Sequence, residues 1–168
     1  GKAINTGGSL IRTEATGYGC VYFAKAMLEK NNDSLKGKIC TVSGSGNVAQ
    51  YTTEKLLEYG AKVVSLSDSS GTIYDEAGIT TEKLEFVKDL KTNKHGRISE
   101  YAKKYNVPFY ERKTPWFIAC DLAFPSATQN EVLLEDAKIL VENGCKYVVE
   151  GSNMGSSAEA LEYFKKQK

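Results

Sequence analysis

The chain has 168 residues, which is enough for one domain with a single hydrophobic core and short for two. Apolar residues make up 41% and charged residues 26% of the chain, a composition typical of folded globular proteins and not of disordered ones. The 22 basic and 21 acidic residues give a formal net charge of +1, so the totals do not indicate a nucleic acid or an anionic membrane as partner. No apolar run approaches the ~20 residues of a membrane-spanning helix, and no signal peptide opens the sequence. We therefore expect a soluble, cytoplasmic protein.

Neither the cysteines nor the histidine indicate a metal site. The four cysteines lie far apart, form no CxxC pair and each stand among apolar residues, which favours reduced core side chains: Cys20, Cys40, Cys120 and Cys145. The single histidine, His95, lies in the polar stretch KTNKHGR, where a solvent-exposed turn is the simpler interpretation. One histidine without a Cys or His cluster does not build a zinc centre.

Along the chain, the hydrophobic spacing switches repeatedly between helix and strand periods. Thr13 is expected to cap a first helix that ends near Asn31, after which strands and helices alternate. The expected strands are 38–42, 61–67, 107–110, 118–124 (ended by Pro125) and 146–150. The expected helices run from the glycine-rich stretch to Gly60, from Thr80 or Thr81 through Leu90, over 98–105 and 133–143, and from Ser156, with Glu159 at capping-box spacing.

Strands that alternate with helices predict a mostly parallel sheet with helices on both faces and right-handed crossovers. The fold class expected is therefore α/β, doubly wound and Rossmann-like, with residues 1–168 in a single domain.

The stretch Gly44-Ser45-Gly46-Asn47-Val48-Ala49 matches G-x-G-x-x-G/A between an expected strand and an expected helix. In that context Gly44 permits the turn, Gly46 lets backbone amides approach a pyrophosphate, and Ala49 keeps helix and sheet close. The helix N-terminus adds unpaired N–H groups and a partial positive charge. A purely structural turn is the alternative, but the context favours a dinucleotide.

Asp68 ends the second expected strand, 24 residues after Gly44. This is close to the roughly 20-residue spacing at which an acid accepts hydrogen bonds from a ribose 2′-hydroxyl, and by itself it favours NAD over NADP. The alternative is an acid that caps the exposed turn SDSSG.

Neighbouring residues favour NADP instead. Ser67, Ser69 and Ser70 are candidate donors to a phosphate, and Lys91 and Arg97 lie near the end of the next expected helix. Arginine suits phosphate oxygens, although basic residues on a polar surface are usually only solvated. Spacing alone leaves the choice of cofactor open.

Three further stretches are expected near the end of a bound dinucleotide. EATGYG puts two glycines into the first helix, where either a packing helix comes close or a nicotinamide ring does, with its carboxamide bonded to Thr16. PSATQNE and EGSN each follow an expected strand and so line the carboxyl edge of the sheet. Thr128 and Gln129 are alternatively caps of the next helix, and Asn153 a turn residue.

Five stretches, GGSLIRTEATGYG, VSGSGNVAQY, SLSDSSGT, PSATQNE and EGSNM, in this order and with these separations, closely resemble the nucleotide-binding domain of the hexameric NADP-type glutamate dehydrogenases. The resemblance covers nearly the whole chain. It implies NADP, because NADP-using members carry an acid at the Asp68 position beside basic residues matching Lys91 and Arg97. It also implies a role for each matched residue: Thr16 contacts the nicotinamide carboxamide, Asn47 and Val48 the pyrophosphate, and Ala127, Gln129 and Asn153 the nicotinamide ribose region.

The family reaction is the reversible oxidative deamination of L-glutamate to 2-oxoglutarate and ammonia. The family's substrate lysines, catalytic lysine and catalytic aspartate lie upstream of GGSLIR, so we expect a partial domain that binds cofactor and holds no catalytic residue. Glutamate and 2-oxoglutarate would be bound through the missing domain, and the full-length protein would be a homohexamer while this piece is a monomer. The sequence departs from the commoner family pattern at Ser152 and Gly155, where alanine and proline are usual.

Other interpretations remain open from the sequence. A leucine or phenylalanine dehydrogenase that uses NAD, or a methyltransferase with the same fold, would explain the glycine loop but not the combination of SDSSGT, the long stretch 72–116 and PSATQNE. A non-catalytic nucleotide-sensing module would explain the absent catalytic residues.

Overall fold

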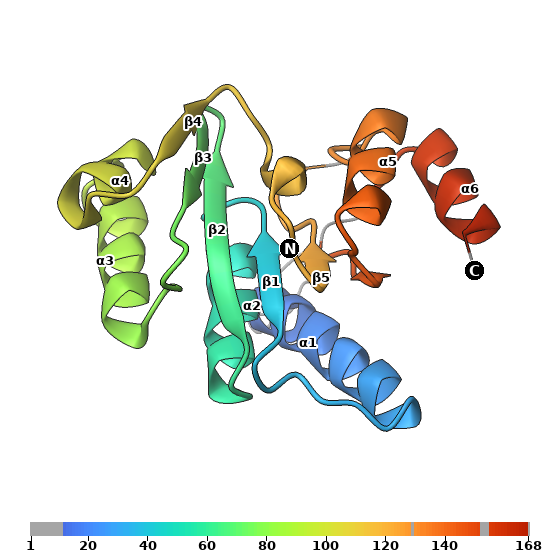
Figure 1. Cartoon of the computed structure of the whole chain (residues 1–168). Helices are drawn as coiled ribbons and strands as arrows, with labels where there is room; N and C mark the ends of the chain where they lie inside the picture. Colours follow the sequence, from blue (N-terminus) through green and yellow to red (C-terminus); the bar gives the residue numbers. More distant parts are fainter. Residues whose placement is uncertain (1–11, 129, 152–154, 168) are drawn as a thin grey trace, which may run out of the picture.

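The computed structural model describes residues 12–128, 130–151 and 155–167. In this part of the chain six strands form one sheet in the order β4-β3-β2-β1-β5-β6 (Figure 1). The strands are β1 (Ile39–Val42), β2 (Lys62–Asp68), β3 (Gly71–Tyr74), β4 (Phe109–Glu111), β5 (Leu122–Phe124) and β6 (Tyr147–Val148). The helices are α1 (Arg12–Lys30), α2 (Asn47–Glu58), α3 (Thr81–Thr92), α4 (Ser99–Tyr105), α5 (Leu134–Glu142) and α6 (Ala158–Lys166), with a 3₁₀ turn, η2, at Pro115–Phe117.

The sheet is parallel at its centre and antiparallel at one edge. β1 pairs in parallel with β2 and β5, and β5 pairs in parallel with β6. The strand expected at 107–110 lies at 109–111 as β4, and through two antiparallel pairings it runs in the same direction as β2. The strand between them, β3, was not predicted and is the one that is reversed. The cause is a tight hairpin, because Gly71 pairs directly with Asp68 and the chain turns back without a crossover helix.

Helices cover both faces of the sheet, as predicted, and the alternation of side chains along β5 shows how. Leu122 and Phe124 belong to one hydrophobic cluster, which α1, α2, α3 and α4 complete. Ala123 points to the opposite face and belongs to a second cluster, which η2, α5 and α6 complete. The predicted Rossmann-like α/β class is therefore confirmed, and the antiparallel edge is an addition to it.

One predicted helix start is confirmed and another is shifted by one residue. Thr80 caps α3 by accepting a hydrogen bond from the Lys83 amide at 3.2 Å. The last helix begins one residue later than expected, because Ser157, not Ser156, accepts the cap hydrogen bond, from Ala160. Thr13 lies within α1, whose described part runs over Arg12–Lys30, so the helix does not start after Thr13 as predicted.

The fourth predicted strand, 118–124, is shorter than expected. Pro115 opens the 3₁₀ turn, and the Ile118 amide donates to the Pro115 carbonyl at 3.1 Å, so these residues cannot join the sheet. The strand β5 therefore begins only at Leu122. It ends before Pro125, as predicted.

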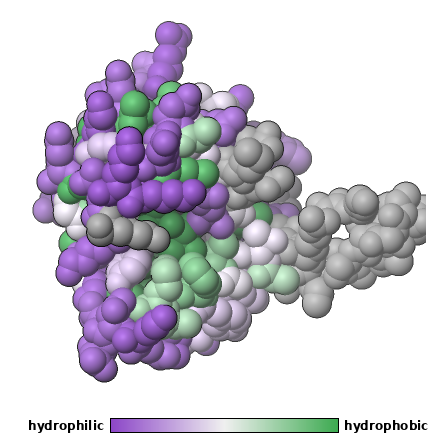
Figure 2. All heavy atoms as spheres, turned by 90° about the vertical axis from the view of Figure 1, so that its right-hand side faces the viewer, coloured by the Kyte–Doolittle hydropathy of each residue, from purple (hydrophilic) through white to green (hydrophobic). Residues whose placement is uncertain are grey.

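Figure 2 shows the side of the molecule that carries α6. Apolar side chains gather in a hollow in the middle of this face, between polar ones. The groove on this side is lined by side chains of α1 and α6, among them Phe23, Met27 and Leu161, beside the edge strand β6. Among the described residues, no helix is long and apolar enough to cross a membrane.

Candidate functional site

The parallel strands bring the loops that follow them to one edge of the sheet, and two adjoining hollows lie there. We call them together the edge groove. The first hollow, of about 420 Å³, is lined by Gly44–Val48, Ser67, Asp68, Lys91, Ser126 and Ala127. The second, of about 350 Å³, shares Ser67, Asp68 and Ala127 with the first and adds Ser69, Gly71, Arg112, Lys113, Thr114, Thr128 and Glu131. Most of the predicted site residues therefore meet in one place.

Gly44 is needed for the shape of the glycine loop. Its φ is +84°, and a Cβ at this position would lie 3.1 Å from the Ser126 carbonyl oxygen and 3.2 Å from the Ala127 Cβ. The Gly44 amide donates to the Ser67 hydroxyl at 2.8 Å, and the Ser67 amide donates to the Gly44 carbonyl at 3.0 Å. Ser67 thus holds the glycine loop against the end of β2.

Gly46 faces open space at the start of α2. It is the N-cap residue, with no heavy atom within 4 Å of where a Cβ would stand. Within the described residues no side chain caps this helix start, and Asn47 is exposed there. The first amides of α2 are therefore available to an anion. Ala49 is fully buried and packs in the first cluster, as the glycine pattern predicts.

Asp68 lies at the end of β2 and accepts four hydrogen bonds. Its Oδ1 accepts from the amide and the hydroxyl of Ser70, and its Oδ2 accepts from Lys91 Nζ at 2.8 Å and from the Ile98 amide at 2.7 Å. Burial raises the pKa of Asp68, but the hydrogen bonds from Lys91, Ser70 and Ile98 outweigh it and hold the pKa at about 2. The carboxylate is charged at neutral pH and anchors Lys91.

The two predicted phosphate-binding cations converge on this point. Lys91 comes from the last turn of α3, and Arg97 from the segment before α4. Arg97 donates to the Ser69 hydroxyl at 2.7 Å, so both cations lie within reach of the Asp68–Ser70 turn. Lys91 is partly buried and Arg97 is exposed.

The loop after β5 is held by Glu131. Its Oε2 accepts from the amides of Ala127 and Thr128, each at 2.9 Å, and the Ser126 amide donates to the Ser43 hydroxyl at 2.9 Å. Burial raises the pKa of Glu131 more than the hydrogen bonds from Ser43 and the two amides lower it. Glu131 was not predicted as a site residue, although it ends the stretch PSATQNE.

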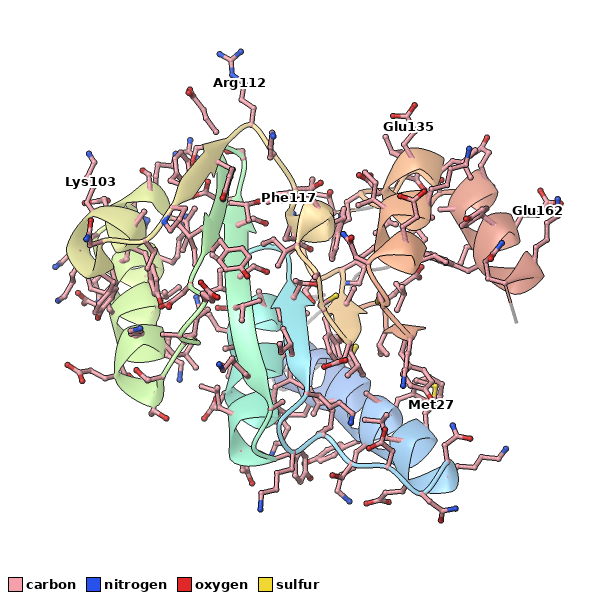
Figure 3. The ribbon with its side chains drawn as sticks, in the orientation of Figure 1. Met27, Lys103, Arg112, Phe117, Glu135 and Glu162 are labelled. Atoms are coloured by element: carbon pink, nitrogen blue, oxygen red, sulfur yellow. The ribbon has the colours of Figure 1, made fainter. Side chains whose placement is uncertain are left out.

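Two basic residues of the second hollow were also missed. Arg112 and Lys113 follow β4 and line the hollow together with Ser69, and the Arg112 amide donates to the Ser70 carbonyl at 2.9 Å. Figure 3 shows Arg112 projecting outward from this end of the sheet, so its charge lies at the rim. The sequence feature that could have identified them is a pair of adjacent basic residues after an expected strand. Their position beside the groove depends on the pairing of β4 with β3, which was not predicted.

Thr16 lines neither hollow. The neighbouring Gly17 is buried against α2, where a Cβ would lie 2.8 Å from the Tyr51 Cβ and 3.1 Å from the Val48 carbonyl oxygen. Helix packing therefore explains this glycine, and the contact of Thr16 with nicotinamide stays a prediction. Gln129 and Asn153 lie outside the described residues.

The chain matches the family model described as Glutamate/Leucine/Phenylalanine/Valine dehydrogenase over residues 7–168. It belongs to this family. It is 54% identical over 162 residues to the NADP-specific glutamate dehydrogenase of Haemophilus influenzae, covering 96% of this chain and 36% of that protein. It is 54% identical over 168 residues to the NAD(P)-specific glutamate dehydrogenase of Xylanibacter ruminicola, covering 100% of this chain and 38% of that protein.

The fold of the chain also matches solved structures of glutamate dehydrogenases. The structure of a Plasmodium falciparum glutamate dehydrogenase matches with a TM-score of 0.90 at 48% sequence identity, covering 99% of this chain and 36% of that one. The resemblance inferred from the five sequence stretches is confirmed at the level of the family. The chain spans just over a third of the length of the relatives that it matches.

Proposed function

We propose that this chain is the cofactor-binding domain of a glutamate dehydrogenase and that its edge groove binds NADP(H). The observation that carries the proposal is the hydrogen bonding of Asp68. An ionised carboxylate offers about four acceptor positions, and four donors from Ser70, Lys91 and Ile98 already use them. Little capacity is left to accept from a ribose 2′-hydroxyl, which is the role that would favour NAD.

The same hydrogen bonds favour a 2′-phosphate. An ammonium has three donors, and Asp68 takes one of those of Lys91, so the others can turn to phosphate oxygens beside Ser69 and Arg97. Arginine adds a planar pair of donors suited to phosphate. The name of one close relative, NADP-specific, agrees with this assignment, and the name NAD(P)-specific of another makes a direct test necessary.

The residues present fit the rest of a dinucleotide. The open space at Gly46 and the free N-terminus of α2 would take the pyrophosphate beside Asn47 and Val48. The nicotinamide end would then extend toward Ala127 and Thr128, with Thr16, Gln129 and Asn153 proposed on the basis of the family resemblance. When bound, the nicotinamide supplies or accepts a hydride. The chain's own residues bind and orient it.

For the whole protein we propose the reversible oxidative deamination of L-glutamate to 2-oxoglutarate and ammonia, with the substrate and the acid/base groups held outside this domain. Closure of the two domains would bring substrate and cofactor together and exclude water. We further propose a cytoplasmic homohexamer for the full-length protein and a monomer for this domain alone.

Calorimetric titration of the purified chain with NADPH and with NADH tests the assignment. We expect NADPH to bind about tenfold more tightly, a difference of about 1.4 kcal/mol. Equal affinity, or tighter NADH binding, would return Asp68 to the ribose role and favour an NAD-using amino-acid dehydrogenase. Binding of neither would leave the glycine loop as a structural turn in this chain.

Replacing both cations tests the residues themselves. In the double variant Lys91→Ala/Arg97→Ala, NADPH affinity should fall about tenfold or more while NADH affinity stays within about twofold, because only NADPH carries the 2′-phosphate. Lys94→Ala is the matched control, since Lys94 is exposed near the end of the same helix and pairs with Asp89. NADPH affinity that changes by less than about twofold in the double variant would show that these cations do not bind the phosphate.

A further inference from the structure

Two cysteines stand side by side at the amino ends of β5 and β6. Leu122 pairs with Tyr147 across these parallel strands, and Cys120 and Cys145 each precede their strand by two residues. The Lys146 amide donates to the Asp121 carbonyl at 2.9 Å, which extends the pairing toward the two cysteines. Neighbouring strands lie about 4.8 Å apart, within the roughly 4.4–6.8 Å between Cα atoms that a disulfide spans.

The two thiols are also in contact. The Cys145 sulfur contacts both the Tyr147 carbonyl, at 3.3 Å, and the Cys120 sulfur, which also accepts from the Thr41 hydroxyl at 3.4 Å. The hydrogen bond from Cys145, together with that from Thr41, lowers the pKa of Cys120 despite its burial. The same contact and burial raise the pKa of Cys145. The proton of the pair therefore stays on Cys145, and Cys120 is the thiolate suited to attack the Cys145 sulfur once that sulfur has been oxidised.

Cys145 can be reached from the surface, whereas Cys120 is buried. Cys145 borders a groove of about 570 Å³ between α1, β6 and α6, on the apolar face seen in Figure 2. Cys120 is only 6% exposed and packs in the second cluster. The Cys20 thiol contacts the Glu150 carbonyl. Cys40 stands on the neighbouring strand β1, in register with Leu122, but its side chain packs in the first cluster and not in the second.

We propose that Cys120 and Cys145 form a reversible intramolecular disulfide when the protein meets a peroxide. The Cys145 sulfur, which is the one that a peroxide can reach, attacks one oxygen of hydrogen peroxide as it gives up its proton, the O–O bond breaks, and the released hydroxide takes up that proton as water. The Cys120 thiolate then attacks the sulfur of the resulting sulfenic acid, the S–S bond forms, and the S–O bond breaks with loss of a second water. Two thiols and one peroxide become one disulfide and two waters.

Thiol counting and intact mass on the purified chain test the site. After reductant is removed and hydrogen peroxide is added, we expect the loss of two thiols, a mass lower by two hydrogen atoms, and one cross-linked peptide containing Cys120 and Cys145. Dithiothreitol should restore both thiols. The variants Cys120→Ser and Cys145→Ser should give no intramolecular cross-link, and the matched control Cys20→Ser should cross-link as the unchanged protein does.

The peptide map of the unchanged protein shows which cysteines are cross-linked, so the test holds even where a serine variant fails to fold. A cross-link that includes Cys20 or Cys40, a disulfide between two molecules, or a gain of oxygen on Cys145 without loss of the Cys120 thiol would overturn the proposal.

Discussion

The four hydrogen bonds of Asp68 make it a source of pH-dependent stability. Its pKa is about 2 in the folded protein, below the ordinary value of 3.8. The stabilisation is therefore fully present above the unfolded pKa and is lost as the pH falls through the folded one. The shift corresponds to about 2 kcal/mol of unfolding free energy at neutral pH.

Urea unfolding of Asp68→Asn measures this contribution. The variant should lose about 2 kcal/mol at pH 7 and should show a smaller fall in stability between about pH 5 and pH 2 than the unchanged protein. Glu142→Gln is the control, because Glu142 is an exposed carboxylate at the end of α5. If Asp68→Asn kept the full pH dependence of the unchanged protein, the acid would not be held by these partners.

The surroundings of the two glycines of the glycine loop, Gly44 and Gly46, differ, and this allows a second prediction. Gly44→Ala forces a residue with φ near +84° against Ser126 and Ala127, and should lower the unfolding free energy by about 1–2 kcal/mol. Gly46→Ala meets no neighbour, so its stability should change by less than about 0.5 kcal/mol while its methyl group occupies the space proposed for the pyrophosphate.

Urea unfolding and NADPH titration of both variants separate the two roles. Weakened NADPH binding at unchanged stability in Gly46→Ala would support the proposed pose. Unchanged NADPH binding in Gly46→Ala would place the pyrophosphate elsewhere.

Some residue roles were readable from the sequence and others were not. The need for glycine at Gly44 follows from local turn geometry, which spacing encodes. The role of Asp68 depends on hydrogen bonds from Lys91 and Ile98, which lie more than twenty positions further along the chain. No local sequence pattern predicts such distant partners. The hold of Glu131 on the loop after β5 was missed for a related reason, because it accepts from backbone amides, which every residue possesses.

At the scale of elements, the packing of α1 on α2 depends on one of the two glycines in α1. A Cβ at Gly17 would lie 2.8 Å from the Tyr51 Cβ, whereas a Cβ at Gly19 meets nothing within 4 Å. Gly17→Ala should therefore destabilise the protein, by about 1–3 kcal/mol. Gly19→Ala should stabilise it by up to about 1 kcal/mol, because alanine favours a helix interior.

Thermal and urea unfolding of these two variants give the comparison, and opposite signs are the expected result. Destabilisation of similar size in both would mean that general loss of glycine in α1, and not the contact with α2, is responsible.

The elements that the sequence predicted best are those with long periodic patterns. The helices α2 and α3 and the strand β2 lie within a residue or two of their expected ends, because apolar spacing and capping residues such as Thr80 and Gly60 mark them locally. The strand β3 was missed, because Gly71 was assigned to the turn SDSSG and the next three residues to no element; pairing with β2 and β4 orders them. Gly71 shows the same dependence: a Cβ there would collide with the Tyr110 carbonyl oxygen of β4.

At the scale of the whole molecule, the groove and the cysteine pair lie at opposite ends of the same strands. The segments that leave β5 and β6 at their carboxyl ends approach the edge groove, where a Cβ at Gly151 would lie 2.7 Å from the Ser126 hydroxyl. The two cysteines precede these strands at their amino ends. The sequence placed both sets of residues near strands, but only the order β1-β5-β6 makes Cys120 and Cys145 neighbours.

The described residues of this domain supply contacts suited to a cofactor, and the proposed division of labour places the reacting substrate elsewhere in the protein. We therefore expect the purified 168-residue chain to bind NADPH but not to oxidise it when 2-oxoglutarate and ammonia are added. The physical reason is that hydride transfer requires a substrate held against the nicotinamide with its acid and base groups in place. Absorbance of NADPH at saturating substrate, with the H. influenzae relative as positive control, gives the measurement. Steady oxidation by the chain alone, dependent on both substrates, would place the catalytic groups among these residues and overturn the division of labour.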